Sequence, residues 1–226
     1  MQELWVANLG VVPYGEADAL QQRLREARKA DEMPDTLLLL EHPPVYTRGR
    51  RTPDQELPLG RAFYAAQGID VFEVDRGGRA TYHGPGQLVG YPIMRIGDII
   101  GFLRTIERAI IAALAQHGVA ARGGGERPTG VWVGERKIAS IGVHVSRRVS
   151  THGFAVNVDG DLEPFDWIVP CGLSGVTMTS LALEGGADLD RFRATIAEQF
   201  ALAFERRAQT VDPAALAHAE TAAVAG

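Results

Sequence analysis

Apolar residues recur at intervals of three or four positions in several stretches of this chain, which is the period of an amphipathic helix. The longest such stretch predicts a helix over residues 99–117. Asp98 can cap its first turn, and Gly118 can end it. The same spacing predicts shorter helices over residues 16–28 and 189–204.

Short runs rich in apolar and β-branched residues alternate with these helices and predict strands. The runs at residues 130–133, 137–145 and 151–158 are separated only by short turns, which is typical of an antiparallel meander. We therefore expect an α/β (α+β) fold with a mixed, largely antiparallel sheet flanked by helices. The strands are expected at residues 36–40, 69–74, 87–91, 130–133, 137–145 and 151–158.

The composition indicates one folded domain. The chain has 226 residues, 46% of them hydrophobic and 23% charged, so a core large enough for folding without a disulfide or metal is expected. We assign residues 1–211 to a single domain and the Ala-rich residues 212–226 to a loosely ordered tail.

Charge and apolar run length limit the partners. A net charge of −5 argues against nucleic acid, because proteins that bind phosphate backbones usually carry excess positive charge. The longest apolar runs are far shorter than the roughly 18–20 residues that cross a bilayer, and the first residues lack a secretory signal pattern. We expect a cytoplasmic protein that binds neither membrane nor nucleic acid.

The only cysteine is Cys171, which excludes an internal disulfide and any cysteine-rich zinc site. The histidines also lack metal-ligand spacing, so no metal is expected. Of two histidines near the centre of the meander, His144 is expected to be an ordinary strand residue and His152 to shape a site. A single reduced thiol next to proline and glycine remains a candidate nucleophile.

Three segments place glycine beside polar, reactive side chains: residues 76–87, 137–142 and 170–172. Glycine allows the backbone to approach a ligand closely, although it also serves ordinary turns. The first segment, over residues 76–86, is expected to be an irregular loop between two strands. It has neither the spacing of a P-loop nor that of a dinucleotide-binding turn, which disfavours both kinds of phosphate site.

The order and spacing of four motifs carry a family resemblance over residues 36–183. The motifs are Arg-Gly-Gly-x-x-Thr-Tyr-His-Gly-Pro-Gly-Gln from Arg76, Lys-Ile-Ala-Ser-Ile-Gly from Lys137, His-Gly-Phe-Ala-Val-Asn-Val from His152, and Pro-Cys-Gly around Cys171 with Thr-Ser-Leu following. This pattern resembles the lipoyl(octanoyl) transferases, also called lipoate-protein ligase B. The glycine-rich residues 123–129 have no clear match to the family, and we interpret them as a connecting loop.

The resemblance implies transfer of an octanoyl group from octanoyl-acyl carrier protein to a lysine of a lipoyl domain, through a cysteine thioester. This is the first step of endogenous protein lipoylation. The implied acceptors are the lipoyl domains of 2-oxoacid dehydrogenases and the glycine cleavage H protein, and no cofactor is implied. The implied fold is that of the biotin/lipoate protein ligase catalytic domain.

By resemblance, Cys171 is the nucleophile and Lys137 is its acid–base partner. His83 and Gln87 would line or brace the site, and Ile138, Ile141 or Phe154 would help to form a slot for the acyl chain. The substrate-binding residues implied are Arg76, Gly77, Gly78, Arg79, Ala80, Thr81, Tyr82, His83, Ser140, Ile141, Gly142, Gly153, Phe154 and Ala155.

This pairing of residues suits acyl transfer. An enzyme thioester divides one displacement into two easier steps, but it requires a thiolate. A thiol with a pKa near 8.5 is only about 3% ionised at pH 7, and a neighbouring cation raises that fraction. Lys137 would supply the cation and later accept a proton from the incoming amine.

Three other functions stay open at the level of sequence. An ATP-dependent lipoate or biotin ligase would share the fold without needing Cys171. A non-catalytic module that binds acyl carrier protein would not depend on the thiol, and a Cys-His hydrolase would release the acyl group to water. Separately, the basic cluster Arg48, Arg50 and Arg51 is a candidate docking surface for an acidic carrier.

Overall fold

The computed structural model describes residues 1–50, 52–125, 129–168 and 176–216. Within them, the main sheet has eight strands in the order β11-β1-β2-β6-β10-β9-β8-β7. β1 runs parallel to β11 and β2, and every other neighbouring pair is antiparallel. The strands are β1 Gln2–Val11, β2 Asp35–Glu41, β6 Gln87–Ile93, β7 Arg122–Gly123, β8 Gly130–Val133, β9 Arg136–Ser146, β10 Val149–Asn157 and β11 Arg206–Thr210.

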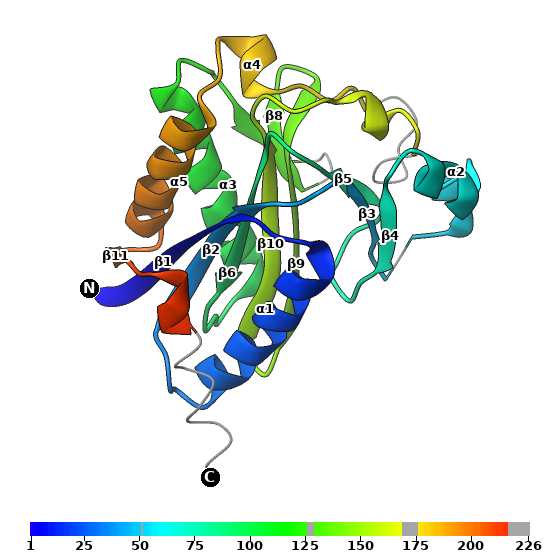
Figure 1. The fold of residues 1–226 in the computed structure, drawn as a ribbon. Coiled ribbons are helices and arrows are strands. Elements are labelled where there is room, and N and C mark those ends of the chain that lie inside the picture. Colours follow the sequence, from blue (N-terminus) through cyan, green and yellow to red (C-terminus); the bar gives the residue numbers. More distant parts are fainter. Residues whose placement is uncertain (51, 126–128, 169–175, 217–226) are drawn as a thin grey trace.

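Helices cover both faces of this sheet (Figure 1). α1, Tyr14–Lys29, packs on one face, and α3, Ile99–Gln116, lies beside α5, Leu189–Ala203, on the other. The Asp98 carboxylate accepts hydrogen bonds from the backbone N–H groups of Ile100 and Gly101, which confirms the expected N-cap. The mixed, largely antiparallel sheet flanked by helices is confirmed.

A second, three-stranded sheet stands beside the first. Its order is β4-β3-β5, with β3 Val45–Arg48, β4 Asp70–Glu73 and β5 Thr81–His83. β5 lies inside the segment expected to be an irregular loop, so that expectation is wrong for Thr81–His83. The strand forms because β3, some 35 residues earlier in the chain, supplies its antiparallel partner.

Short helices complete the fold. They are α2 Gly60–Ala66, α4 Leu181–Glu184 and two 3₁₀ turns, Asp54–Glu56 and Glu163–Phe165. None of the helices in the described residues is long and apolar enough to cross a membrane.

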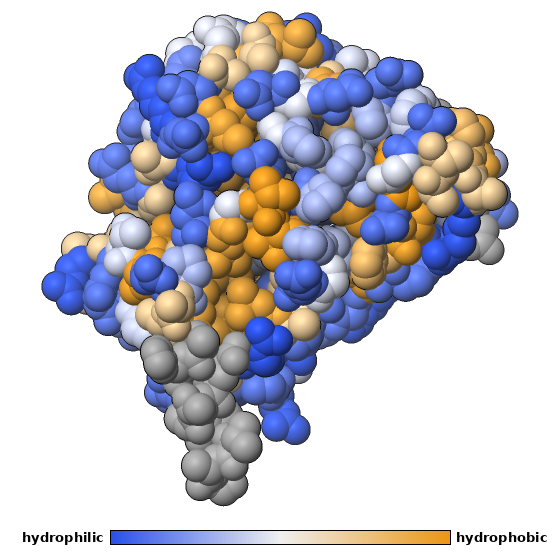
Figure 2. Space-filling model, in the orientation of Figure 1, coloured by the Kyte–Doolittle hydropathy of each residue, from blue (hydrophilic) through white to orange (hydrophobic). Residues whose placement is uncertain are grey.

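The predicted tail begins with a packed turn. Residues 213–216 are helical, and Leu216 is only 2% exposed in the apolar cluster of α1. Figure 2 shows apolar side chains gathered between α1 and this turn. Leu216 therefore differs from the loosely ordered tail expected here, because its large apolar side chain finds a place in the core. Residues 217–226 lie outside the described part.

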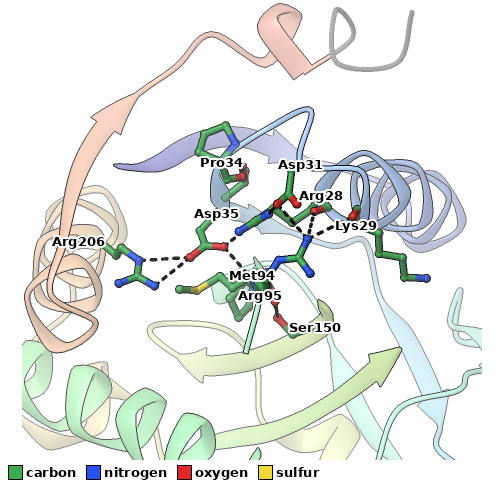
Figure 3. A network of polar contacts seen from close by, with 11 residues as sticks. Arg28, Lys29, Asp31, Pro34, Asp35, Met94, Arg95, Ser150 and Arg206 are labelled. Atoms are coloured by element: carbon green, nitrogen blue, oxygen red, sulfur yellow. Dashed lines mark hydrogen bonds and ion pairs between the residues drawn. The ribbon is translucent and has the colours of Figure 1, made fainter. Parts of the chain in front are cut away.

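One buried carboxylate joins the end of the sheet to α1 (Figure 3). Asp35 accepts hydrogen bonds from Arg28 Nε at 2.9 Å, from the backbone N–H of Arg95 at 3.0 Å, and from Arg206 Nε and a terminal nitrogen, both at 3.2 Å. Asp35 is 3% exposed. It therefore holds α1, β11 and the segment after β6 together at the first residue of β2.

Candidate active site

A cavity of about 510 Å³ lies where the glycine-rich loop after β4 meets β9 and β10. The backbone N–H of Gly77 donates to the Val143 carbonyl at 3.0 Å, which fastens the loop to β9. A Cβ on Gly142 would stand 2.9 Å from the Gly77 carbonyl oxygen. The glycine at 142 thus permits this close approach of loop and strand.

The structure brings nearly all of the predicted substrate-binding residues to this cavity. The lining includes the residues predicted in the loop 76–83 except Tyr82, and all of those predicted in 140–142 and 153–155. Tyr82 turns away into an apolar cluster, where its ring centroid lies 5.5 Å from that of Phe165. Of the candidates for the acyl slot, Ile141 and Phe154 line the cavity, whereas Ile138 is fully buried in the main core.

Arginines brace the loop. The Arg76 guanidinium donates to the Thr47 carbonyl at 3.0 Å, to Thr47 Oγ1 at 2.7 Å and to the Gly77 carbonyl at 3.1 Å. Arg79 pairs with the buried Glu56 carboxylate at 2.7 Å. These contacts hold the loop backbone in the shape that forms one wall of the cavity.

Lys137 lies at the cavity and is 2% exposed. Its Nζ stands 5.7 Å from the ring centroid of Trp132, a favourable position for a buried cation. The space around the side chain depends on Gly130, which has φ +149° and whose added Cβ would come within 2.7 Å of Lys137 Cε. β8 and β9 therefore fix the amine.

The segment that follows Cys171 joins the strand of Lys137. The Lys137 backbone N–H donates to the Thr177 carbonyl at 2.9 Å, and its carbonyl accepts from the Thr179 N–H at 3.0 Å. Cys171 itself lies outside the described residues, and Thr177 is six positions further along the chain.

His83 is hydrogen-bonded to a buried pair of side-chain amides. Its Nδ1 lies 2.6 Å from Gln87 Oε1, and Gln87 Nε2 donates to Asn157 Oδ1 at 2.9 Å. Asn157 Nδ2 then donates to the Thr179 carbonyl at 3.0 Å. Burial lowers the pKa of His83 to about 3, so its imidazole is neutral at physiological pH. Gln87 braces the site, as expected.

His152 also lines the cavity, and its backbone conformation is unusual. Its φ is +56°, a left-handed conformation that is uncommon for residues other than glycine. Gln21 Oε1 accepts its backbone N–H at 2.6 Å, and its Nε2 lies 2.9 Å from Asp75 Oδ1. The hydrogen bond from His152 is the main reason why the pKa of Asp75 falls to about 2. His152 therefore shapes the site, with Asp75 as its partner.

The sequence did not predict several of these residues. Asp75 directly precedes Arg76, but only the fold brings it to His152 and within 3.5 Å of His144. Tyr14 and Tyr91 line the cavity from α1 and β6. Tyr14 precedes the helix predicted over residues 16–28 and Tyr91 ends a predicted strand, so no local signal marked either as a cavity residue.

Arg48 and Arg50 of the basic cluster differ in their exposure and in their ion-pair partners. Arg48 pairs with Glu73 at 2.8 Å and is largely buried, whereas the Arg50 side chain is 60% exposed and lies 3.9 Å from Asp75. Arg51 lies outside the described residues. Docking of a carrier at this cluster stays a prediction. In the described part of the chain, no group of three His, Asp or Glu side chains is placed to hold a metal ion.

Known proteins resemble this chain over most of its length. Residues 13–201 match the model of the lipoyl protein ligase A/B catalytic domain. An octanoyltransferase from Acidothermus cellulolyticus is 49% identical over 213 residues, which cover 91% of this chain and 90% of that protein.

Solved structures share the fold at low sequence identity. In the structure of a bi-partite lipoate protein ligase and its E2 lipoyl domain from Thermoplasma acidophilum, the match has a TM-score of 0.75 at 20% identity and covers 96% of this chain and 91% of that chain. The biotin protein ligase of Aquifex aeolicus has a TM-score of 0.52 at 11% identity, over 91% and 70% of the two chains. These likenesses confirm the predicted fold class. The match of residues 13–201 and the relative that is 49% identical show that the chain belongs to the lipoyl protein ligase A/B catalytic-domain family, which confirms the family resemblance carried by its motifs.

Proposed function

We propose that this protein is an octanoyltransferase, which moves an octanoyl group from a carrier thioester to a lysine of a lipoyl domain. The relative that is 49% identical over 91% of the chain carries that name. The observation that carries the proposal is the position of Lys137. A buried amine faces a partly apolar cavity, and its strand is hydrogen-bonded to the segment that follows Cys171.

The first half of the reaction loads the enzyme. The Cys171 thiolate attacks the octanoyl carbonyl, a new C–S bond forms, and the carrier leaves as a thiol after taking up a proton. A positive Lys137 stabilises the thiolate before attack and supplies that proton afterwards. Lys137 is then neutral.

The second half transfers the acyl group. The lysine amine of the lipoyl domain attacks the Cys171 thioester, a C–N bond forms, and the C–S bond breaks to regenerate the thiolate. The neutral Lys137 accepts the proton that the amine loses. The second half therefore restores the Cys171 thiolate and the protonated Lys137 that the first half consumed. No metal or nucleotide is required.

The apolar part of the cavity suits the acyl chain. Ile141, Val143, Phe154 and Leu103 line it. Burial of about six methylene groups at roughly 0.8 kcal/mol each provides about 5 kcal/mol for binding. We propose that the predicted loop residues that line the cavity, together with residues 140–142 and 153–155, bind this substrate.

The proposed partners are those that the family resemblance implies. The donor is octanoyl-acyl carrier protein, and the acceptors are lipoyl domains of 2-oxoacid dehydrogenases and the glycine cleavage H protein. A cytoplasmic location accords with both. The main alternative is an ATP-dependent lipoate ligase. The solved ligases share the fold at 20% identity or less, whereas the octanoyltransferase relative is 49% identical.

The experiment supplies a purified lipoyl domain with octanoyl-acyl carrier protein in one reaction and with octanoate, ATP and Mg²⁺ in another. Mass spectrometry of the lipoyl domain measures the product. We expect octanoylation in the first reaction and none in the second. Modification that requires ATP would instead assign the chain to the ligases, and release of free octanoate without modification would indicate a hydrolase.

A further inference from the structure

His83 has a fixed hydrogen-bonding state, and the two proposed half-reactions assign it no role in proton transfer or in orienting the amine. It lines the cavity and is 7% exposed. Its ring is stacked on Tyr14, with centroids 6.3 Å apart, and meets His42 edge-on at 5.6 Å. The ring is thus held from two sides.

The two side-chain amides determine which ring nitrogen of His83 carries the proton. The Thr179 carbonyl can only accept, so Asn157 turns its Nδ2 toward it and its Oδ1 toward Gln87. Gln87 must then donate through Nε2, which also reaches the Tyr82 carbonyl at 3.2 Å. Its Oε1 is left facing His83, so Nδ1 is the donor.

The same assignment leaves Nε2 of His83 with a lone pair. This nitrogen is the remaining polar atom of a ring that lines the cavity. Burial is the main cause of the low pKa of His83, and the nearby His42, Arg76 and His152 lower it further. His83 therefore accepts hydrogen bonds at neutral pH without taking up a proton.

The other uncharged side-chain acceptors in the described lining are hydroxyl groups and the imidazole of His152, whose two ring nitrogens already contact Asp75 and Tyr14. Among its described lining residues there is no Asp or Glu, and the basic side chains Lys137, Arg76 and Arg79 are donors when charged. An attacking amine must direct its lone pair at the carbonyl carbon while its N–H groups are held elsewhere. A neutral acceptor that is too weak a base to remove the proton meets this need.

We propose that Nε2 of His83 accepts an N–H hydrogen bond from the attacking lysine amine and so aims its lone pair at the acyl carbonyl. This inference rests on the proposed function and concerns only its second half. The amine still loses its proton to Lys137, and His83 neither gains nor loses one. Gln87 and Asn157 are positioning residues, because they act through His83.

Two substitutions separate the two ring nitrogens. In His83→Asn, the side-chain amide can still donate to Gln87 but places nothing at the position of Nε2. In His83→Gln, the longer side chain can place an oxygen acceptor near that position. Single-turnover measurements with octanoyl-acyl carrier protein follow loading of the enzyme, and a chase with saturating lipoyl domain follows transfer.

We expect His83→Asn to load within about threefold of the wild-type rate and to transfer about 100-fold more slowly, as for a lost orienting contact. His83→Gln should recover at least about tenfold of that loss. Transfer by His83→Asn at the wild-type rate would overturn the inference. An equal loss in loading and transfer, with an unchanged melting temperature, would also overturn it, because it would assign His83 to a step common to both halves.

A third substitution uses pH. Gln87→Glu places a carboxylate against Nδ1–H and so raises the pKa of His83. Protonation of Nε2 then removes the acceptor, and the transfer rate should fall on the acidic side of neutrality, while wild-type transfer shows no such limb from this group. A folded Gln87→Glu enzyme with the wild-type pH profile would contradict the inference. If the wild-type enzyme itself forms no acyl-enzyme, the proposed function fails first.

Discussion

Removal of the Asp35 carboxylate should destabilise the fold and leave the lining of the cavity unchanged. Asp35 is buried, and its oxygens accept from Arg28, Arg95 and Arg206. In Asp35→Ala, two guanidinium groups and one backbone N–H lose their shared acceptor. Figure 3 shows how these donors converge on one carboxylate from different elements.

The size of the effect follows from the burial of the partners. Removal of one member of a buried ion pair costs about 3–5 kcal/mol. The side chains of Arg28 and Arg206 are 13% and 21% exposed, so both can regain some hydration. We therefore expect a loss of about 3 kcal/mol in the free energy of unfolding, which for a chain of this length lowers the melting temperature by roughly 6–12 °C.

Urea unfolding followed by circular dichroism measures the change, and Asp31→Asn is the matched control. Asp31 also contacts Arg28 and Arg95, but its side chain is 70% exposed, so its loss should leave the midpoint close to wild type. A loss below about 1 kcal/mol in Asp35→Ala, or equal losses in both variants, would refute this reasoning.

Two further predictions concern acidity and a strained turn. Burial lowers the folded-state pKa of His42 to about 4 and that of His83 to about 3 from 6.5, so the unfolded chain binds protons first as the pH falls. The free energy of unfolding should fall between pH 6.5 and 5, by on the order of 2 kcal/mol for each histidine. Urea titrations at both pH values should show a smaller fall in the free energy of unfolding for His42→Gln than for the wild type. Arg147 and Arg148 connect β9 to β10 with φ values of +47° and +69°, where Asn-Gly is preferred. Replacing the pair by Asn-Gly should raise the free energy of unfolding by about 1 kcal/mol, and an unchanged urea midpoint would show that the turn is not strained.

The sequence predicted elements whose signals are local. The period of three to four residues and the Asp98 cap located α3, and β8 was predicted with its observed bounds. β5 was missed because its partner β3 is distant in the chain and glycines surround it. β11 was missed because Arg206–Thr210 is a polar edge strand that pairs only with β1.

Some features of the candidate site were likewise predicted from the sequence, and others were not. The family resemblance predicted residues of the cavity wall, where Gly77 is hydrogen-bonded to β9 and Gly142 of β9 pairs with Gly153 of β10. Tyr82, which the resemblance also implied to bind substrate, does not line the cavity, because alternation along the short β5 turns its ring into the neighbouring core. The sequence did not predict the contact between Asp75 and His152. That contact depends on the left-handed backbone conformation of His152, which the residue type does not indicate.

The thioester at Cys171 can be tested by intact-mass analysis of the enzyme after incubation with octanoyl-acyl carrier protein. We expect one added octanoyl group that hydroxylamine removes, that a lipoyl domain discharges, and that Cys171→Ala does not acquire. Octanoylation of the lipoyl domain by Cys171→Ala at the wild-type rate would rule out the thioester, because the acyl group would then reach the lysine without it.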